Sequence, residues 1–221
     1  MSTAGRPIDE YSGYIVDMDG TLYRQKPVRW SMLFRLLSYF LLHPLQIKEL
    51  YAILIYRRIR ERNAFADEAD FEEKQIEYVS KHCRIEKDRF KAAQDKWMNK
   101  VPLECISRNR DEGLIGFLKS RISEKATVIV YSDYPVKDKL KAVGLKPDLC
   151  FYSGDPEIAC MKPDPKGLKN IIRISGIPAE DILYIGDRYE KDGKCAESCH
   201  MDYLILKHKF NHKAQSRGKM A

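Results

Sequence analysis

Short runs of apolar residues recur along the chain, and each run ends in polar residues. Five of these runs are rich in β-branched and aromatic residues, as is typical of strands that are buried on both faces of a sheet. Helix-length amphipathic segments lie between the later runs, and this alternation predicts an α/β fold with a parallel sheet. The expected strands are Tyr14–Val16, Thr127–Tyr131, Leu149–Tyr152, Ile182–Ile185 and Tyr203–Leu206. The expected helices are about Glu112–Ile122, Val136–Val143, Pro165–Ile174 and Glu190–Cys199.

One long segment interrupts this alternation between the first and the second strand. It contains no convincing strand, and its apolar spacing predicts helices only. We therefore expect a Rossmann-like, doubly wound parallel sheet core, residues 1–23 and 109–221, with an inserted all-helical cap domain at 24–108. The helices expected in the cap lie near Trp30–His43, Leu45–Glu61, Glu68–His82 and Glu86–Asn99.

The net charge of +7 is concentrated in segment 24–62, which holds nine basic and only two acidic residues. The same segment is rich in aromatic residues and leucine. One interpretation is ordinary packing of cap helices. The other is peripheral contact with an anionic membrane surface. That second interpretation places Trp30, Phe34 and Phe40 against apolar chains, and Arg57, Arg58, Arg60 and Arg62 near the head groups.

Composition narrows the class of protein further. With 44% hydrophobic residues in 221, the chain can bury a sizeable core, which excludes a disordered protein. Six cysteines without a CxxC pair, and a start without a cleavable signal sequence, predict a cytoplasmic location. The longest uncharged stretch in the cap, Leu36 to Ile47, is too short to span a bilayer. No nucleic-acid recognition motif occurs, so we expect no nucleic-acid partner.

Two acids follow the first expected strand directly. In open α/β sheets, ligands bind at the carboxyl ends of the strands, so Asp17 and Asp19 are well placed for chemistry. Residues two apart in extended chain point the same way, and both carboxylates could therefore converge on one substrate. Gly20 then lets the chain turn away sharply.

Three later elements also carry polar groups at strand ends or before a helix. Ser132 and the backbone N–H of Asp133 follow the second strand, where they can hold phosphoryl oxygens. Lys162 stands in a proline-stiffened segment before a helix. Asp187 follows the fourth strand and could join Asp17 around a hard cation such as Mg²⁺.

Taken together and in this order, the four elements resemble the haloacid dehalogenase superfamily, in its phosphatase-like branch with a helical cap between the first two motifs. The resemblance rests on DMDGT at 17–21, SDYP at 132–135, KPDP at 162–165 and GDxxxxD at 186–192. Two departures from the usual pattern are Arg188 and the stretch Ser198-Cys199-His200.

The resemblance implies a role for each matched residue. Asp17 is the expected nucleophile. Asp19 is the expected acid and base, a role that calls for a carboxyl kept protonated by its surroundings. Lys162 is expected to offset negative charge. The expected substrate-binding residues are Thr21, Ser132 and Asp133. The expected Mg²⁺ ligands are Asp17, the backbone carbonyl of Asp19, and Asp187. Gly186 and Asp192 are expected to support these ligands.

The function implied is hydrolysis of a small-molecule or amphiphilic phosphomonoester by a Mg²⁺-dependent phosphatase. Dehalogenases of the superfamily lack an acid at the position of Asp19, so dehalogenation is not expected. The alternatives are a phosphomutase of the same fold, phosphonate cleavage with a cap amine such as Lys26 or Lys48, and a membrane-associated binding protein that uses the cationic cap.

Overall fold

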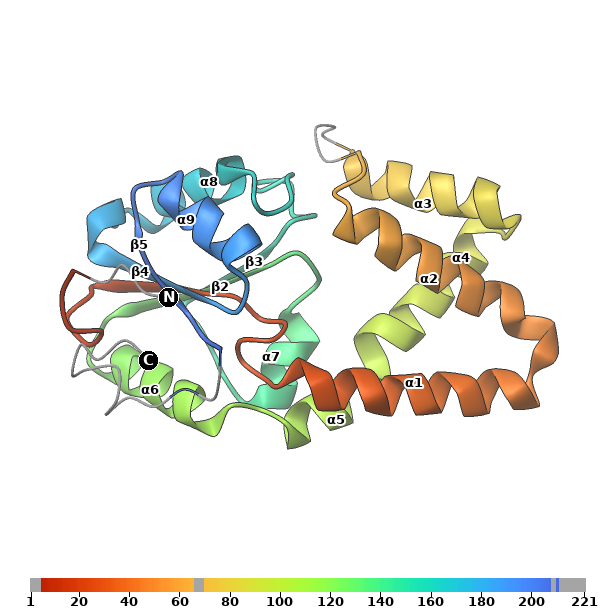
Figure 1. Ribbon diagram of the computed structural model, residues 1–221. Coiled ribbons are helices and arrows are strands. Elements are labelled where there is room, and N and C mark those ends of the chain that lie inside the picture. Colours follow the sequence, from red (N-terminus) through yellow and green to blue (C-terminus); the bar gives the residue numbers. More distant parts are fainter. Residues whose placement is uncertain (1–4, 66–69, 208–209, 211–221) are drawn as a thin grey trace. The chain divides into compact units, whose positions relative to one another are not determined.

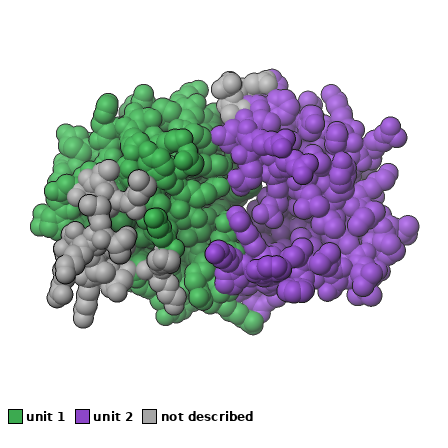
Figure 2. All heavy atoms as spheres, viewed as in Figure 1, with its two compact units in different colours: residues 1–25, 106–221 green, residues 26–105 purple. Residues whose placement is uncertain are grey.

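The computed structural model describes residues 5–65, 70–207 and 210. The chain divides into two compact units (Figure 2). Unit 1 comprises residues 1–25 and 106–221, and unit 2 comprises residues 26–105, which compares with the insertion predicted at 24–108.

Unit 1 is built on a parallel sheet of five strands in the order β3-β2-β1-β4-β5 (Figure 1). Helices flank the sheet, so the predicted α/β fold is confirmed, and each strand lies within one or two residues of its expected position. The strands are β1 (Gly13–Val16), β2 (Thr127–Ser132), β3 (Leu149–Tyr152), β4 (Ile182–Gly186) and β5 (Asp202–Ile205).

The central strand β1 is wholly buried because both faces of the sheet are covered. Its last residue, Val16, pairs with Val130 of β2 and with Ile185 of β4. The carboxyl ends of these three strands therefore lie side by side, and the residues that follow them meet at one edge of the sheet.

The helices of unit 1 follow the prediction except near the end of the chain. In place of one helix over Glu190–Cys199, a π-helical turn at Tyr189–Gly193 precedes the short α9 (Lys194–Glu197). The wide turn directs the buried side chain of Asp192 towards Lys162. The other helices are α6 (Glu112–Ser123), α7 (Lys137–Val143) and α8 (Pro165–Ser175), with a 3-10 turn at Ala179–Asp181, and α5 (Leu103–Arg108) lies at the boundary between the units.

Unit 2 is all-helical in its described residues. The helix predicted from Glu68 begins at Phe71 in the structure, and residue 68 itself lies outside the described residues. No helix in the described ranges has the length and apolarity needed to cross a membrane. The elements are α1 (Gln25–Leu42), a 3-10 turn (Pro44–Gln46), α2 (Ile47–Glu61), α3 (Phe71–Cys83), α4 (Lys87–Gln94) and a π-helical turn (Asp95–Lys100).

Two residues expected at a membrane-facing surface of the cap are buried instead. Arg60 donates to the Tyr56 hydroxyl at 3.0 Å and to Gln75 Oε1 at 3.1 Å, and it pairs with Glu72 at 2.9 Å. Phe40 packs against the Trp97 ring, with centroids 5.7 Å apart. The expectation is therefore wrong for Arg60 and Phe40, because each completes the interior of unit 2.

Candidate active site

The carboxyl edge of the sheet gathers the predicted polar residues of unit 1. Asp17 directly follows β1, and its backbone N–H continues the ladder by donating to the Ile185 carbonyl at 2.9 Å. Ser132 is the last residue of β2, and Asp187 directly follows β4. Lys162 comes from the segment before α8, whose start is fixed by Asp164 as the N-cap and by Pro165.

The Asp17 carboxylate is held by two donors. Lys162 Nζ lies 2.5 Å from Asp17 Oδ1, and the Thr21 hydroxyl donates to Asp17 Oδ2 at 3.1 Å. Lys162 is only 1% exposed and also contacts Asp192 Oδ1 at 2.7 Å and the Tyr184 hydroxyl at 3.3 Å. One buried ammonium thus serves two buried carboxylates, which leaves the site short of positive charge.

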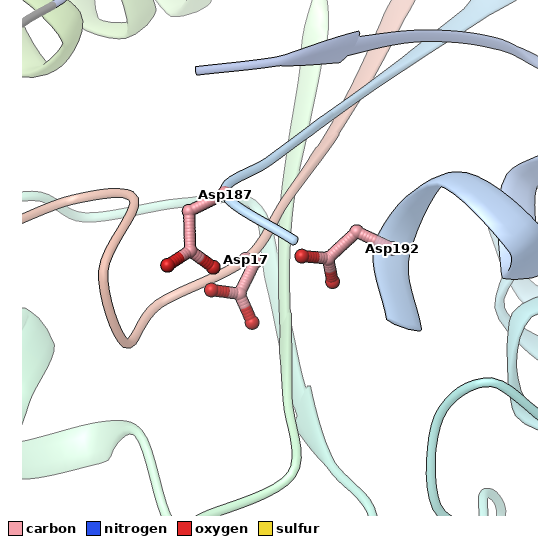
Figure 3. Close-up of side chains that lie close together, drawn as sticks. All are labelled: Asp17, Asp187 and Asp192. Atoms are coloured by element: carbon pink, nitrogen blue, oxygen red, sulfur yellow. The ribbon is translucent and has the colours of Figure 1, made fainter. Parts of the chain in front are cut away.

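Three carboxylates converge at this point (Figure 3). One oxygen each from Asp17, Asp187 and Asp192 lies within 4.8 Å of the others. Burial, together with the neighbouring Asp192 and Asp187, raises the pKa of Asp17 to about 8 although Lys162 lowers it. Burial and Asp192 likewise raise the pKa of Asp187 to about 6. Mutual repulsion therefore disfavours full ionisation of the cluster.

Asp187 shows directly what the cluster lacks. Its Oδ1 is buried and accepts no hydrogen bond from the described residues, and the Arg188 Nε lies 3.9 Å away, beyond hydrogen-bond distance. A divalent cation would satisfy this oxygen and offset the repulsion among the carboxylates. Carboxylate oxygens are the ligands that Mg²⁺ prefers, so the residues present fit a Mg²⁺ ion.

Two glycines allow the chain to pass close to these acids. Gly20 has a φ of +110°, and a Cβ at this position would collide with the Asp187 carboxylate. A Cβ at Gly186 would lie 2.5 Å from Asp192, so the predicted supporting role of Gly186 has a steric basis.

The Asp19 side chain points to a different set of partners. Lys139 Nζ lies 2.6 and 2.7 Å from its two carboxylate oxygens, the Ser132 hydroxyl donates to Oδ2 at 3.2 Å, and the Tyr23 hydroxyl donates to Oδ1. Burial raises the pKa of Asp19, but Lys139, Tyr23 and Ser132 together outweigh burial and hold the pKa below its ordinary value. The expectation that its surroundings keep Asp19 protonated is therefore wrong for this arrangement.

Asp133 lies behind the cluster rather than in it. Its Oδ1 accepts from the backbone N–H of Lys162 at 3.1 Å, and its Oδ2 contacts Lys191 Nζ at 2.9 Å. The carboxylate thus fixes the backbone that carries Lys162. Substrate binding by Asp133 stays a prediction for its backbone N–H.

Residues 11–200 match the protein family described as haloacid dehalogenase-like hydrolases. The chain belongs to this family. No curated protein sequence matches it significantly.

Solved structures support the fold of this haloacid dehalogenase-like hydrolase. A 2-haloacid dehalogenase from Pseudomonas syringae pv. tomato DC3000 matches with a TM-score of 0.59 and 16% identity, over 87% of this chain and 85% of that one. A magnesium-bound putative hydrolase of the superfamily from Bacillus subtilis matches with a TM-score of 0.57 and 15% identity, over 89% of each chain. A putative phosphoglycolate phosphatase from Lactobacillus plantarum matches with a TM-score of 0.54 and 15% identity, over 93% of this chain and 91% of that one. At such identities the likeness shows the fold alone.

Sequence reasoning missed the partners of Asp19 and Asp133 in this hydrolase. The burial of Lys139 could have been predicted, because it shares a helix face with the buried residues Val136 and Val143. A buried lysine needs an acidic partner. Lys191 lies inside the GDxxxxD motif but shows no comparable signal. Tyr23 follows the first motif by two residues, and a single sequence does not indicate where its hydroxyl points.

Proposed function

We propose that this hydrolase is a Mg²⁺-dependent phosphatase that hydrolyses a phosphomonoester through an aspartyl-phosphate intermediate. One observation carries the proposal: the Asp17 carboxylate is held by Lys162 within 4.8 Å of Asp187, whose buried Oδ1 lacks a hydrogen-bond partner among the described residues. This arrangement suits a nucleophilic carboxylate that approaches an anionic phosphoryl group beside a cation.

Asp17 and Asp187 would hold the Mg²⁺ ion, and the backbone carbonyl of Asp19 is a further predicted ligand. Asp192 supports them, because its Oδ1 is bonded to Lys162 and its Oδ2 accepts from the Arg188 backbone N–H at 3.1 Å. When bound, the cation supplies positive charge that reduces repulsion between the Asp17 carboxylate and the phosphate.

In the first step, an Asp17 oxygen attacks phosphorus, and the bond between phosphorus and the ester oxygen breaks. Asp19 gives its proton to the leaving oxygen, which departs as the alcohol. In the second step, Asp19 takes a proton from water, and the hydroxide attacks phosphorus. The bond to Asp17 breaks and inorganic phosphate leaves. Lys162 offsets charge throughout, while the Ser132 hydroxyl and the Asp133 backbone N–H orient phosphoryl oxygens.

The contact between Lys139 and Asp19 bears on the first step. A carboxyl that donates a proton gains nothing from a neighbouring ammonium, so this ion pair must loosen before the leaving group is protonated. An incoming phosphoryl group carries negative charge that competes with Asp19 for Lys139. Substrate binding would thus release the acid at the point where it is needed.

The proposal covers the place of action as well. All six cysteines are free thiols, which supports the reducing cytoplasm as the compartment in which the enzyme works.

A substrate panel tests the function. The purified protein is given sugar, nucleotide, small-acid and lipid phosphates, with Mg²⁺ or with EDTA, and released phosphate is measured. We expect release with Mg²⁺ only, and none from Asp17→Asn. Isomerised sugar phosphate without net release would indicate a phosphomutase, and chloride release from a 2-chloro acid would indicate a dehalogenase. Either result would contradict the proposal.

A further inference from the structure

Exposed apolar side chains are concentrated in one part of the described chain. Of the twelve large hydrophobic residues that are exposed, ten lie between residues 30 and 54 of unit 2. The ten are Trp30, Leu33, Phe34, Leu37, Leu41, Leu42, Leu45, Ile47, Tyr51 and Leu54. Single exposed apolar residues are common, but a dense group of this kind marks a contact surface.

On α1 the exposed apolar residues follow the helix repeat. Trp30, Phe34, Leu37 and Leu41 are three or four positions apart and so lie along one face, and the Trp30 and Phe34 rings are 6.3 Å apart between centroids. The buried residue Met32 lies on the opposite face of the same helix. This apolar stripe therefore faces away from the side by which α1 is buried.

The stripe leads into the corner where α1 meets α2 (Figure 1). Four aliphatic side chains project there: Leu41, Leu42, Leu45 and Ile47 are 82%, 76%, 92% and 52% exposed. We call the stripe and this corner together the apolar face. Exposing so much apolar area to water costs free energy that a partner can recover.

Basic residues flank the apolar face along the chain. The chain from Leu36 to Ile47 carries no charge, and Arg35 and Lys48 stand at its two ends. Within the part of the chain that the structure describes, none of the following exposed cations is paired with a carboxylate: Lys26, Arg29, Lys48, Arg57, Arg58 and Arg62. The acid nearest in sequence to the corner, Glu49, forms a salt bridge with Arg89, with Nε and Oε1 2.9 Å apart.

We propose that the apolar face docks on the surface of a bilayer that contains anionic phospholipids. Apolar side chains entering the boundary between head groups and acyl chains, with basic residues around them, are what such a surface binds. A second copy of the chain fits less well, because it would bring the same unpaired cations against the first. The docking surface goes beyond the proposed phosphatase activity and does not depend on it.

Vesicle co-sedimentation of the full chain tests the proposal. Vesicles of phosphatidylcholine alone are compared with vesicles that also contain phosphatidylglycerol, at low salt and at about 0.5 M salt, where charge interactions are screened. We expect binding to the anionic vesicles at low salt and weaker binding at high salt. Absence of binding to anionic vesicles at low salt would overturn the proposal.

Two variants separate the apolar from the cationic contribution. Leu42→Ser with Leu45→Ser should weaken binding by about tenfold or more, since each leucine loses its transfer into the bilayer. Arg57→Glu with Arg58→Glu should weaken binding to anionic vesicles by a similar factor. All four side chains are exposed, so the fold should survive, which circular dichroism checks.

Matched controls change the same properties in unit 1. Ile174→Ser removes an exposed apolar side chain from α8, and Lys119→Glu with Lys169→Glu makes the same change of charge as the arginine variant. Neither control should alter binding by more than about twofold. Equal losses in controls and test variants would show only non-specific attraction and would overturn the proposal.

Tryptophan fluorescence locates the contact. The chain has two tryptophans, of which Trp30 is 62% exposed in the apolar face and Trp97 is buried. Brominated phospholipids should quench the wild type, and the quenching should disappear in Trp30→Phe. If instead the wild type sediments as a dimer in the analytical ultracentrifuge, the leucine variant is a monomer and lipid quenching is absent, the apolar face joins two copies and the proposal fails.

Discussion

Lys139 Nζ lies 2.6 and 2.7 Å from the two carboxylate oxygens of Asp19, and the two side chains are only 7% and 12% exposed. The ion pair joins α7 to the loop after β1, so it connects the first motif to the helix that follows the second. It also holds the expected proton donor as a carboxylate. Lys139 therefore influences when Asp19 can carry a proton.

Lys139→Met should change the pH dependence of turnover. Lys139 lowers the pKa of Asp19, so its removal lets Asp19 stay protonated to higher pH. Proton donation requires the protonated form, and the alkaline limb of the pH profile of kcat/KM, which reports the free enzyme, should therefore move to higher pH. Lys141→Met is the control, because Lys141 is exposed and pairs with the exposed Asp138 on its own helix. An unmoved or acid-shifted alkaline limb in Lys139→Met would argue against this role.

Mg²⁺ should stabilise the protein more at alkaline than at acidic pH. The pKa values of Asp17 and Asp187 are raised from 3.8 to about 8 and about 6. Between pH 3.8 and about 8, the folded state therefore binds more protons than the unfolded state. In EDTA, stability should consequently fall as pH rises from about 4 to 8. Thermal unfolding with EDTA or Mg²⁺ at both ends of this range measures the difference. Asp187→Asn should shrink it, whereas an equal Mg²⁺ effect at every pH would contradict the assignment.

The core of this fold could be predicted from the sequence, because buried parallel strands are continuous apolar runs that a reader can locate without an alignment. The acids at the strand ends were also readable, since Asp17 and Asp187 immediately follow β1 and β4. The partners of these acids could not be predicted in the same way, because they depend on tertiary packing. The sequence does not indicate which lysine reaches Asp19, or that Asp192 faces Lys162 from a π-helical turn. In unit 2, the sequence showed the cationic and apolar character of segment 24–62. It did not show that Arg60 is buried while Leu45 is exposed.

Gly20→Ala should impair the metal site without unfolding the core. The φ of +110° strains any side chain, and the new Cβ would push against the Asp187 carboxylate. Calorimetric titration with Mg²⁺ should show at least about tenfold weaker binding. Gly116→Ala is the control: it lies in α6 with open space around the added Cβ, so it should add about 0.5–1 kcal/mol of stability and leave Mg²⁺ binding unchanged. Equal Mg²⁺ affinity in both variants would remove the steric argument.

Lys162→Met should destabilise the fold as well as abolish turnover. The change leaves the buried carboxylates of Asp17 and Asp192 without their shared counter-charge, at a cost on the order of 3 kcal/mol at alkaline pH, above the raised pKa of Asp17. Urea unfolding should show the loss, and it should diminish at low pH as the carboxyls take up protons. Lys169→Met, at an exposed position of α8, should stay within about 0.5 kcal/mol of the wild type. A Lys162→Met protein as stable as the wild type at that alkaline pH would mean that the ion pairs contribute little.

Covalent labelling of Asp17 tests the central claim most directly. The protein is mixed with an aryl phosphate and Mg²⁺, quenched in acid during turnover, digested and analysed by mass spectrometry. The account predicts one phosphoryl group on Asp17 with Mg²⁺ and none with EDTA. It also predicts that Asp17→Asn stays unlabelled and releases phosphate at least about 10²-fold more slowly than the wild type. Undiminished phosphate release by Asp17→Asn, or rapid turnover with the label on another residue, would contradict it.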